Sequence, residues 1–286
     1  MVHFLYSAFS DESGEATLQG QIDACKANGI THMELRGFGS GPNINNITTE
    51  KAKELRAILD KNGMHLSAIG SAYGKIKIKD DFAPHFEAFK NTIEVAKILG
   101  APYIRVFSFY FDSDDDYEAY RDEVLRRVQA MADYGYEHGV LCCHENEKGI
   151  YGDNAERCLD VLQNVRHLRG VFDPANFVQC GQETLEAWRL LAGRIDYLHI
   201  KDALADGTVV PAGCGTGHLA DILRAYLARG GRAMTVEPHL RVFDGLAALE
   251  RSGDTSVIGE RYSYPSADAA FDAACGALQG LLERGE

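Results

Sequence analysis

Three carboxylates and one imidazole recur through the second half of the sequence, each at the end of a short apolar run. Glu145 closes "GVLCCHE", Asp173 closes "GVFD", His199 lies in "DYLHIK" and Glu237 lies in "AMTVEP". A single acid in such a place is usually a helix cap or a solvated loop residue. Together, however, carboxylates and imidazole suit Mn²⁺, Mg²⁺ or Co²⁺ and are unlike a thiolate zinc site. A divalent ion would also remove the repulsion among three clustered carboxylates.

Repeated strand–helix units are needed to bring these four positions together. Short apolar segments alternate with longer amphipathic ones along the whole chain, and three amphipathic segments end at a glycine (Gly29, Gly63, Gly100), as helices often do. Eight strands separated by helices predict an α/β fold, a (β/α)8 TIM barrel that forms a single domain over residues 1–286. An open doubly wound sheet is the alternative. The expected strands are His3–Ser7, His32–Arg36, His65–Ser71, Tyr103–Ser108, Gly139–Glu145, Gly170–Asp173, Asp196–Lys201 and Ala233–Pro238.

Chemistry in such barrels takes place at the carboxyl ends of the strands, so neighbours of the predicted ligands are candidates for contact with substrate. Residues two positions beyond a ligand share its face of an extended strand, and this rule selects Glu147, Lys201 and His239. Pairing of Lys201 with a carboxylate at the barrel mouth is an equal alternative. Arg105 lies on the fourth strand, where an unpaired guanidinium is costly, so it must meet a carboxylate or a ligand oxygen, and pairing with a site carboxylate such as Glu34 or Glu145 is the favoured interpretation.

Three further features have structural interpretations. Glu34, near the end of the second strand, is expected to hydrogen-bond one of the metal-ligating residues without binding the metal itself. His144 should point away from the site and make a structural hydrogen bond. The segment "GCGTGHL" (213–219) lacks the context of a dinucleotide fingerprint, and we interpret it as a loop over the barrel mouth, with a phosphate site at its amides as the alternative.

The motifs "HENEKGIYGD", "FDPANF", "YLHIKDA" and "VEPHL", with "IGSAYGKI" and "YIRVFSFY" in the first half, resemble the sugar isomerase/epimerase family of xylose-isomerase-like TIM barrels. The resemblance covers nearly the whole chain. It implies one divalent metal ion, with Mn²⁺ the first choice and Mg²⁺ or Co²⁺ as alternatives. The ligands that it implies are the four residues selected above: Glu145, Asp173, His199 and Glu237.

The resemblance also implies a reaction. Glu145 and Glu237 would be the catalytic acid/base pair, removing a proton beside a metal-bound carbonyl and passing through an enediolate. Related ketose 3-epimerases have a substrate-binding histidine three residues after the Asp ligand, where this chain has Asn176. Asparagine can hydrogen-bond a sugar hydroxyl but cannot titrate.

Composition limits the partners. The net charge is −13, which argues against nucleic acid, because its backbone is bound mainly by Lys and Arg clusters. No apolar run is long enough for a membrane span and no signal pattern is present, so we expect a cytoplasmic protein without membrane partners. The seven cysteines lack CxxC spacing and are expected to be free thiols. A homo-oligomer is compatible with the resemblance.

The leading interpretation is a divalent-metal-dependent isomerase or epimerase of a carbohydrate or keto-sugar. A lyase that eliminates a leaving group from a 3-oxo-glycoside or related keto-sugar is the alternative within the same chemistry. From another class, the chain could be a non-catalytic sugar-binding subunit. Related DNA-repair endonucleases need more histidine ligands and a basic face, and the sequence supplies neither clearly.

Overall fold

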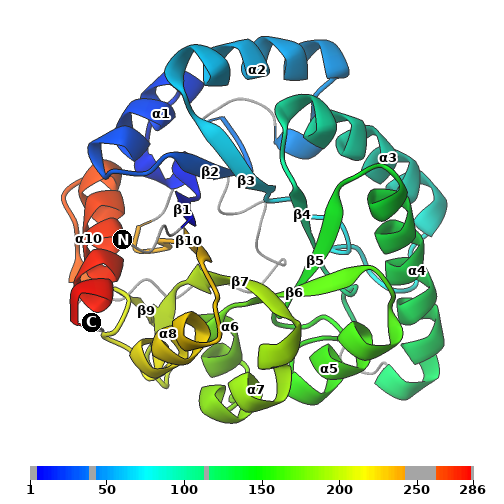
Figure 1. Ribbon diagram of the computed structural model, residues 1–286. Coiled ribbons are helices and arrows are strands. Elements are labelled where there is room, and N and C mark those ends of the chain that lie inside the picture. Colours follow the sequence, from blue (N-terminus) through cyan, green and yellow to red (C-terminus); the bar gives the residue numbers. More distant parts are fainter. Residues whose placement is uncertain (1–4, 39–42, 113–115, 242–261, 285–286) are drawn as a thin grey trace.

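The computed structural model describes residues 5–38, 43–112, 116–241 and 262–284. Eight parallel strands close into a barrel in the order β1-β10-β7-β6-β5-β4-β3-β2, and helices form a ring around it (Figure 1). The predicted (β/α)8 barrel is therefore confirmed, and the open sheet is excluded. The barrel strands are β1 Leu5–Ala8, β2 His32–Leu35, β3 His65–Ile69, β4 Tyr103–Val106, β5 Leu141–Glu145, β6 Leu168–Phe172, β7 Ile195–Ile200 and β10 Ala233–Val236.

The expected strands match these eight, and six of them extend one or two residues too far at their carboxyl ends, whereas the first ends one residue early at Ser7 and the fifth ends correctly at Glu145. Backbone pairing stops at Ile69, Val106 and Val236. The first expected strand also includes His3 and Phe4, which lie outside the described residues. A short antiparallel hairpin of β8 (Asp202–Ala203) and β9 (Val209–Val210), which was not predicted, follows β7.

The helices cover the outer face of the barrel. Gly63 and Gly100 cap α2 and α3 with φ of 60° and 73°, and Gly29 lies just after the end of α1 with φ of 71°, as their position in the sequence predicted. The α-helices are α1 Leu18–Ala27, α2 Thr49–Asn62, α3 Phe82–Leu99, α4 Tyr117–Glu137, α5 Ala155–Asn164, α6 Pro174–Gln179, α7 Thr184–Leu191, α8 Leu219–Ala228 and α10 Ala267–Arg284. Short 3-10 helices are η1 Ser10–Ser13, η2 Ile44–Asn46 and η3 Ala192–Arg194.

Strand alternation divides the core into two layers. Cys142 points outward and packs in the large apolar layer between strands and helices, whereas its neighbour Cys143 points into the barrel. There it packs with Ala68, Val171 and Tyr197 to fill the interior. All seven cysteines are free thiols, as predicted. Among the described residues, no helix has the length and apolar character needed to cross a membrane.

Candidate metal centre

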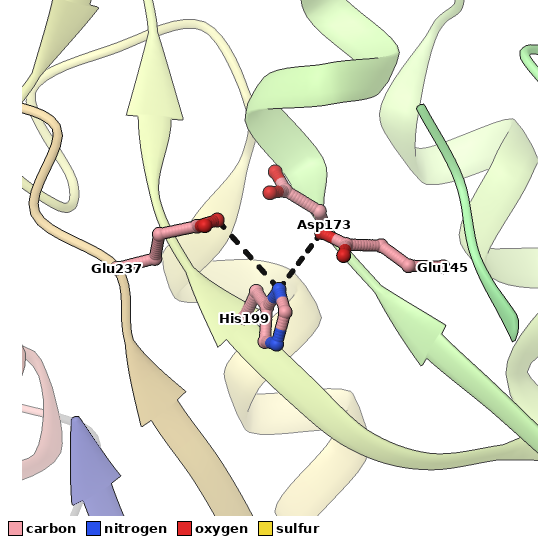
Figure 2. A group of neighbouring side chains, drawn as sticks. All are labelled: Glu145, Asp173, His199 and Glu237. Atoms are coloured by element: carbon pink, nitrogen blue, oxygen red, sulfur yellow. Dashed lines mark hydrogen bonds and ion pairs between the residues drawn. The ribbon is translucent and has the colours of Figure 1, made fainter. Parts of the chain in front are cut away.

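The four predicted ligands converge at the carboxyl ends of neighbouring strands. Each contributes one ligand atom to a group in which all four atoms lie within 4.8 Å of one another, and all four residues are buried (Figure 2). Glu145 is the last residue of β5, Asp173 follows β6, His199 is the fifth residue of β7, and Glu237 follows β10. Since β5, β6, β7 and β10 are consecutive in the barrel, each strand delivers one group to the same point.

His199 lies at the centre of this group. One ring nitrogen faces two of the other ligands, and the second contacts Glu34. Its Nδ1 is 2.8 Å from Glu145 Oε1 and 3.6 Å from Glu237 Oε2 (Figure 2). Its Nε2 is 3.2 Å from Glu34 Oε2, and Glu34 in turn accepts hydrogen bonds from Tyr197 and Thr235. In the metal-free chain both ring nitrogens can donate to these carboxylates, and the acceptor at Nε2 leaves Nδ1 as the nitrogen that can bind an ion once its proton is displaced. Glu34 thus has the supporting position predicted for it.

Asp173 and Glu145 each present a carboxylate oxygen that has no hydrogen bond. Asp173 caps α6, where its Oδ1 accepts the backbone N–H of Asn176 at 3.0 Å. Within the described part of the chain, Asp173 Oδ2 and Glu145 Oε2 are buried without a hydrogen-bond partner, although each lies close to a basic side chain. Buried oxygens left in this state are suited to bind a cation.

Two asparagines tie Glu145 to Asp173. Asn146 exchanges two hydrogen bonds with the backbone of Asp173, both of 2.9 Å. The side-chain nitrogen of Asn176 donates to Asn146 O at 2.9 Å and lies 3.4 Å from Glu145 Oε1. Asn176 therefore braces a ligand, and its predicted contact with substrate stays a prediction. The sequence reasoning missed Asn146, although its place directly after a ligand in "HEN" was visible.

Two buried basic residues neutralise part of the carboxylate charge. Arg105 Nη1 lies 3.1 Å from Glu145 Oε2, which is the carboxylate pairing expected for it. Lys201 Nζ lies 2.7 Å from Asp173 Oδ2 and 2.8 Å from Glu237 Oε2. Of the two roles considered for Lys201, pairing with carboxylates is the one present in the structure.

The directions of the Glu147 and His239 side chains do not follow from strand alternation, which was the predicted reason for their place at the barrel mouth. Strand β5 ends at Glu145 and β10 ends at Val236, so alternation does not extend to either residue. Glu147 pairs with Lys75 at 2.8 Å on the rim of the mouth. His239 has a left-handed backbone (φ 43°) and its Nδ1 lies 3.9 Å from Glu237. His144 points away from the site and bonds to Ser108 at 2.9 Å, as predicted.

Negative charge exceeds positive charge in this buried cluster. Six carboxylates with little exposed surface (Asp11, Glu12, Glu34, Glu145, Asp173 and Glu237) face three buried basic side chains (Arg36, Arg105 and Lys201). The cluster therefore carries an excess of negative charge, which a bound divalent ion would reduce. Burying unbalanced charge is expensive, so these residues fit a divalent metal ion well.

The titration behaviour of two ligands reflects the same excess. Burial lowers the pKa of His199, but the charges of Glu145 and Glu34 outweigh it and raise that pKa to about 10. Burial raises the pKa of Asp173 to about 7, with Glu237 and Glu145 adding to the rise although Lys201 opposes it. Without a metal the cluster therefore takes up protons, and an arriving ion must displace them.

Comparison with known proteins supplies the family. The family model for xylose isomerase-like TIM barrels matches residues 22–251. The chain belongs to this family. Among curated proteins, none matches the sequence.

Solved structures with the same fold resemble this xylose isomerase-like barrel over nearly its whole length. A probable 3-DHS dehydratase, AsbF, from Bacillus anthracis is 16% identical with a TM-score of 0.73, over 97% of this chain and 99% of that one. An L-ribulose 3-epimerase is 15% identical with a TM-score of 0.73, over 99% and 96%. A xylose isomerase-like protein from Mycobacterium smegmatis, in complex with magnesium, is 15% identical with a TM-score of 0.71, over all of both chains. At these identities the likeness shows the fold alone.

The glycine-rich segment of this family member is organised by an internal carboxylate. Asp202, at the start of β8, accepts backbone N–H groups of Ala203, Gly213, Gly215 and Gly217 at 2.9 to 3.0 Å. These amides therefore face a side chain of the protein itself, and the alternative of a phosphate site at the amides that enter α8 stays a prediction.

Asp202→Ala is expected to lower the free energy of unfolding by about 2–4 kcal/mol, because a hydrogen bond to a charged group contributes roughly 1.5–3 kcal/mol, whereas an amide on the exposed side of the loop, such as that of Gly213, can bond to water instead. Urea unfolding followed by circular dichroism measures the change. Asp202→Asn is the matched control, since it keeps one carbonyl acceptor and should lose about half as much. An alanine variant as stable as the wild type would contradict this account of the loop.

Proposed function

We propose that the chain is a divalent-metal-dependent isomerase or epimerase of a carbohydrate. One observation carries the proposal. The three carboxylates and the histidine selected from the sequence converge in a buried cluster whose excess negative charge a divalent ion would reduce. Glu145, Asp173, His199 and Glu237 would hold the ion. Mn²⁺ is our first choice, with Mg²⁺ or Co²⁺ as alternatives, because oxygen ligands dominate the set.

The bound ion would polarise the carbonyl of a keto-sugar and make the neighbouring C–H bond acidic. The residues of the chain then move the proton. Glu145 and Glu237 lie on either side of His199 (Figure 2), so one can take the proton from the carbon and the other can return it. Return to the opposite face of the same carbon gives epimerisation, and return to the neighbouring carbon gives isomerisation.

Both carboxylates are ionised and ready to accept a proton at neutral pH. Burial opposes ionisation of Glu237, but the charges of Lys201, His239 and His199 hold its pKa well below the usual range. Lys201 itself can donate a hydrogen bond to a substrate oxygen from its place between two ligands. Glu147, His239, Arg105 and Asn176 remain predicted substrate contacts.

The charge balance favours an uncharged sugar over a phosphorylated one. The three buried bases of the cluster, Arg36, Arg105 and Lys201, are each already paired with a carboxylate. In the glycine-rich segment, the amides of Gly213, Gly215 and Gly217 are already occupied by Asp202.

The proposal is tested by elemental analysis of the purified protein, followed by a panel of free and phosphorylated keto-sugars in deuterated water. We expect about one divalent ion per chain, and NMR should show deuterium entering a free keto-sugar beside its carbonyl. Release of a second product molecule would instead indicate the lyase. Bound metal without exchange into any sugar would favour a sugar-binding subunit. A cytoplasmic location and a homo-oligomer also remain predictions.

A further inference from the structure

The two oxygens of Glu237 face different partners. Oε2 lies 2.8 Å from Lys201 Nζ, on the side of the proposed metal. Oε1 lies 3.4 Å from Nη1 of Arg36 and 3.9 Å from Nη1 of Arg105. A carboxylate bound in this way cannot rotate without losing one set of contacts.

Arg36 is itself held on the side away from Glu237. It donates through Nε and Nη2 to the two oxygens of Asp11 at 2.9 and 3.0 Å, and through Nη2 to Glu12 at 2.9 Å. The ring of Phe9 lies 4.3 Å from the guanidinium carbon. The side chains of Arg36 and Glu12 are each only 2% exposed, so water screens their attraction little. These contacts define a single orientation for the guanidinium.

Glu12 also holds the backbone beyond Glu237. The N–H of His239 donates to Glu12 Oε2 at 2.6 Å, and the ring Nδ1 of His239 lies 3.1 Å from Glu12 Oε1. The left-handed backbone of His239 (φ 43°) is unfavourable for a residue other than glycine. The contacts with Glu12 offset that cost and fix the segment that carries Glu237.

A second metal ion is the competing interpretation, because Glu12, Glu237 and His239 lie close enough together to hold one. The guanidinium of Arg36, however, contacts both of these acids. An ion among them would meet a permanent positive charge, so the contacts favour a different role.

We propose that Asp11 and Glu12 are positioning residues, which set the orientation of Glu237 through Arg36 and through the backbone of His239. Their side chains come from η1 after β1, whereas Arg36 follows β2 and Glu237 follows β10. Since β10, β1 and β2 are adjacent, the network links the first strands of the barrel to the metal ligands. This inference rests on the proposed function, in which Glu237 is both a ligand and one of the two acid/base groups.

The test is calorimetric titration of the metal-free full chain with Mn²⁺, combined with the exchange assay at saturating Mn²⁺. Glu12→Gln keeps the shape of the side chain and removes its charge, and Arg36→Lys keeps the charge and removes the two-pronged contact. We expect each variant to bind Mn²⁺ about 10- to 100-fold more weakly, as for other residues that orient metal ligands. The kcat for exchange should fall at least about tenfold, with little change in KM.

Asp196→Asn is the matched control, because Asp196 pairs with Arg169 at 2.6 Å near the start of β7, at the opposite end of the barrel. It should change stability while leaving Mn²⁺ affinity within threefold of the wild type.

Wild-type affinity and exchange in both Glu12→Gln and Arg36→Lys would overturn the inference and leave the proposed function intact. A wild-type chain that binds no Mn²⁺, Mg²⁺ or Co²⁺ would overturn both. If a buried variant fails to fold, Asp11→Asn provides the same measurement, since Asp11 is the most exposed acid of the network.

Discussion

Replacing Glu145 or Glu237 by Gln is expected to lower the rate of deuterium incorporation into the substrate by about 10²–10⁴-fold, the contribution of a positioned acid or base. The amide keeps an oxygen for the metal but cannot take up a proton at neutral pH. In the native chain burial acts to raise the pKa of Glu145, but His199 and Arg105 outweigh it and lower that pKa to about 2. NMR at saturating Mn²⁺ measures the exchange rate.

Glu34→Gln is the matched control for these two variants. Glu34 is equally buried and also contacts His199, but it lies behind the ligands and not at the centre. Glu34→Gln should weaken Mn²⁺ binding about 10- to 100-fold. At saturating Mn²⁺ the variant should keep most of the wild-type exchange rate. Exchange that survives in both Glu145→Gln and Glu237→Gln would defeat the acid/base assignment.

Metal binding is expected to stabilise the fold, and His199→Asn should abolish the effect. At a free Mn²⁺ concentration of about 100 times Kd, the free energy of unfolding should rise by about 2.7 kcal/mol. That gain corresponds to an increase in Tm of roughly 5 °C or more for a chain of this size. The physical reason is that the ion balances the excess negative charge of the buried cluster. Differential scanning calorimetry with Mn²⁺ and with a chelator measures the shift.

His144→Asn separates loss of a ligand from loss of a buried histidine. His144 is 1% exposed and lies beside Glu145 in the same strand, but it faces Ser108 and not the ligands. This variant should be less stable than the wild type and still gain stability from Mn²⁺. A His199→Asn chain that responds to Mn²⁺ as the wild type does would exclude His199 as a ligand.

The barrel and the four ligands could be predicted from the sequence because both depend on short-range pattern. Apolar strands alternate with amphipathic helices, and a parallel barrel brings the carboxyl end of every strand to one face. A polar residue at the end of an apolar run, such as Glu145 or Asp173, is therefore placed by its position within one strand–helix unit. His144 followed from alternation within β5, and Glu34 followed from its place near the end of β2, although the pairing of β2 with β3 shifts register between Met33 and Glu34.

Only the tertiary structure decided how the ligands are held. Past the last paired residue of a strand, alternation no longer determines the side to which a side chain points. Glu147 therefore pairs with Lys75, and His239 has a left-handed backbone. The contact of Arg36 with Glu237 joins residues 201 positions apart in the chain. It exists because the closing of the barrel makes β1 the neighbour of both β10 and β2, and no local pattern in the sequence records that pairing.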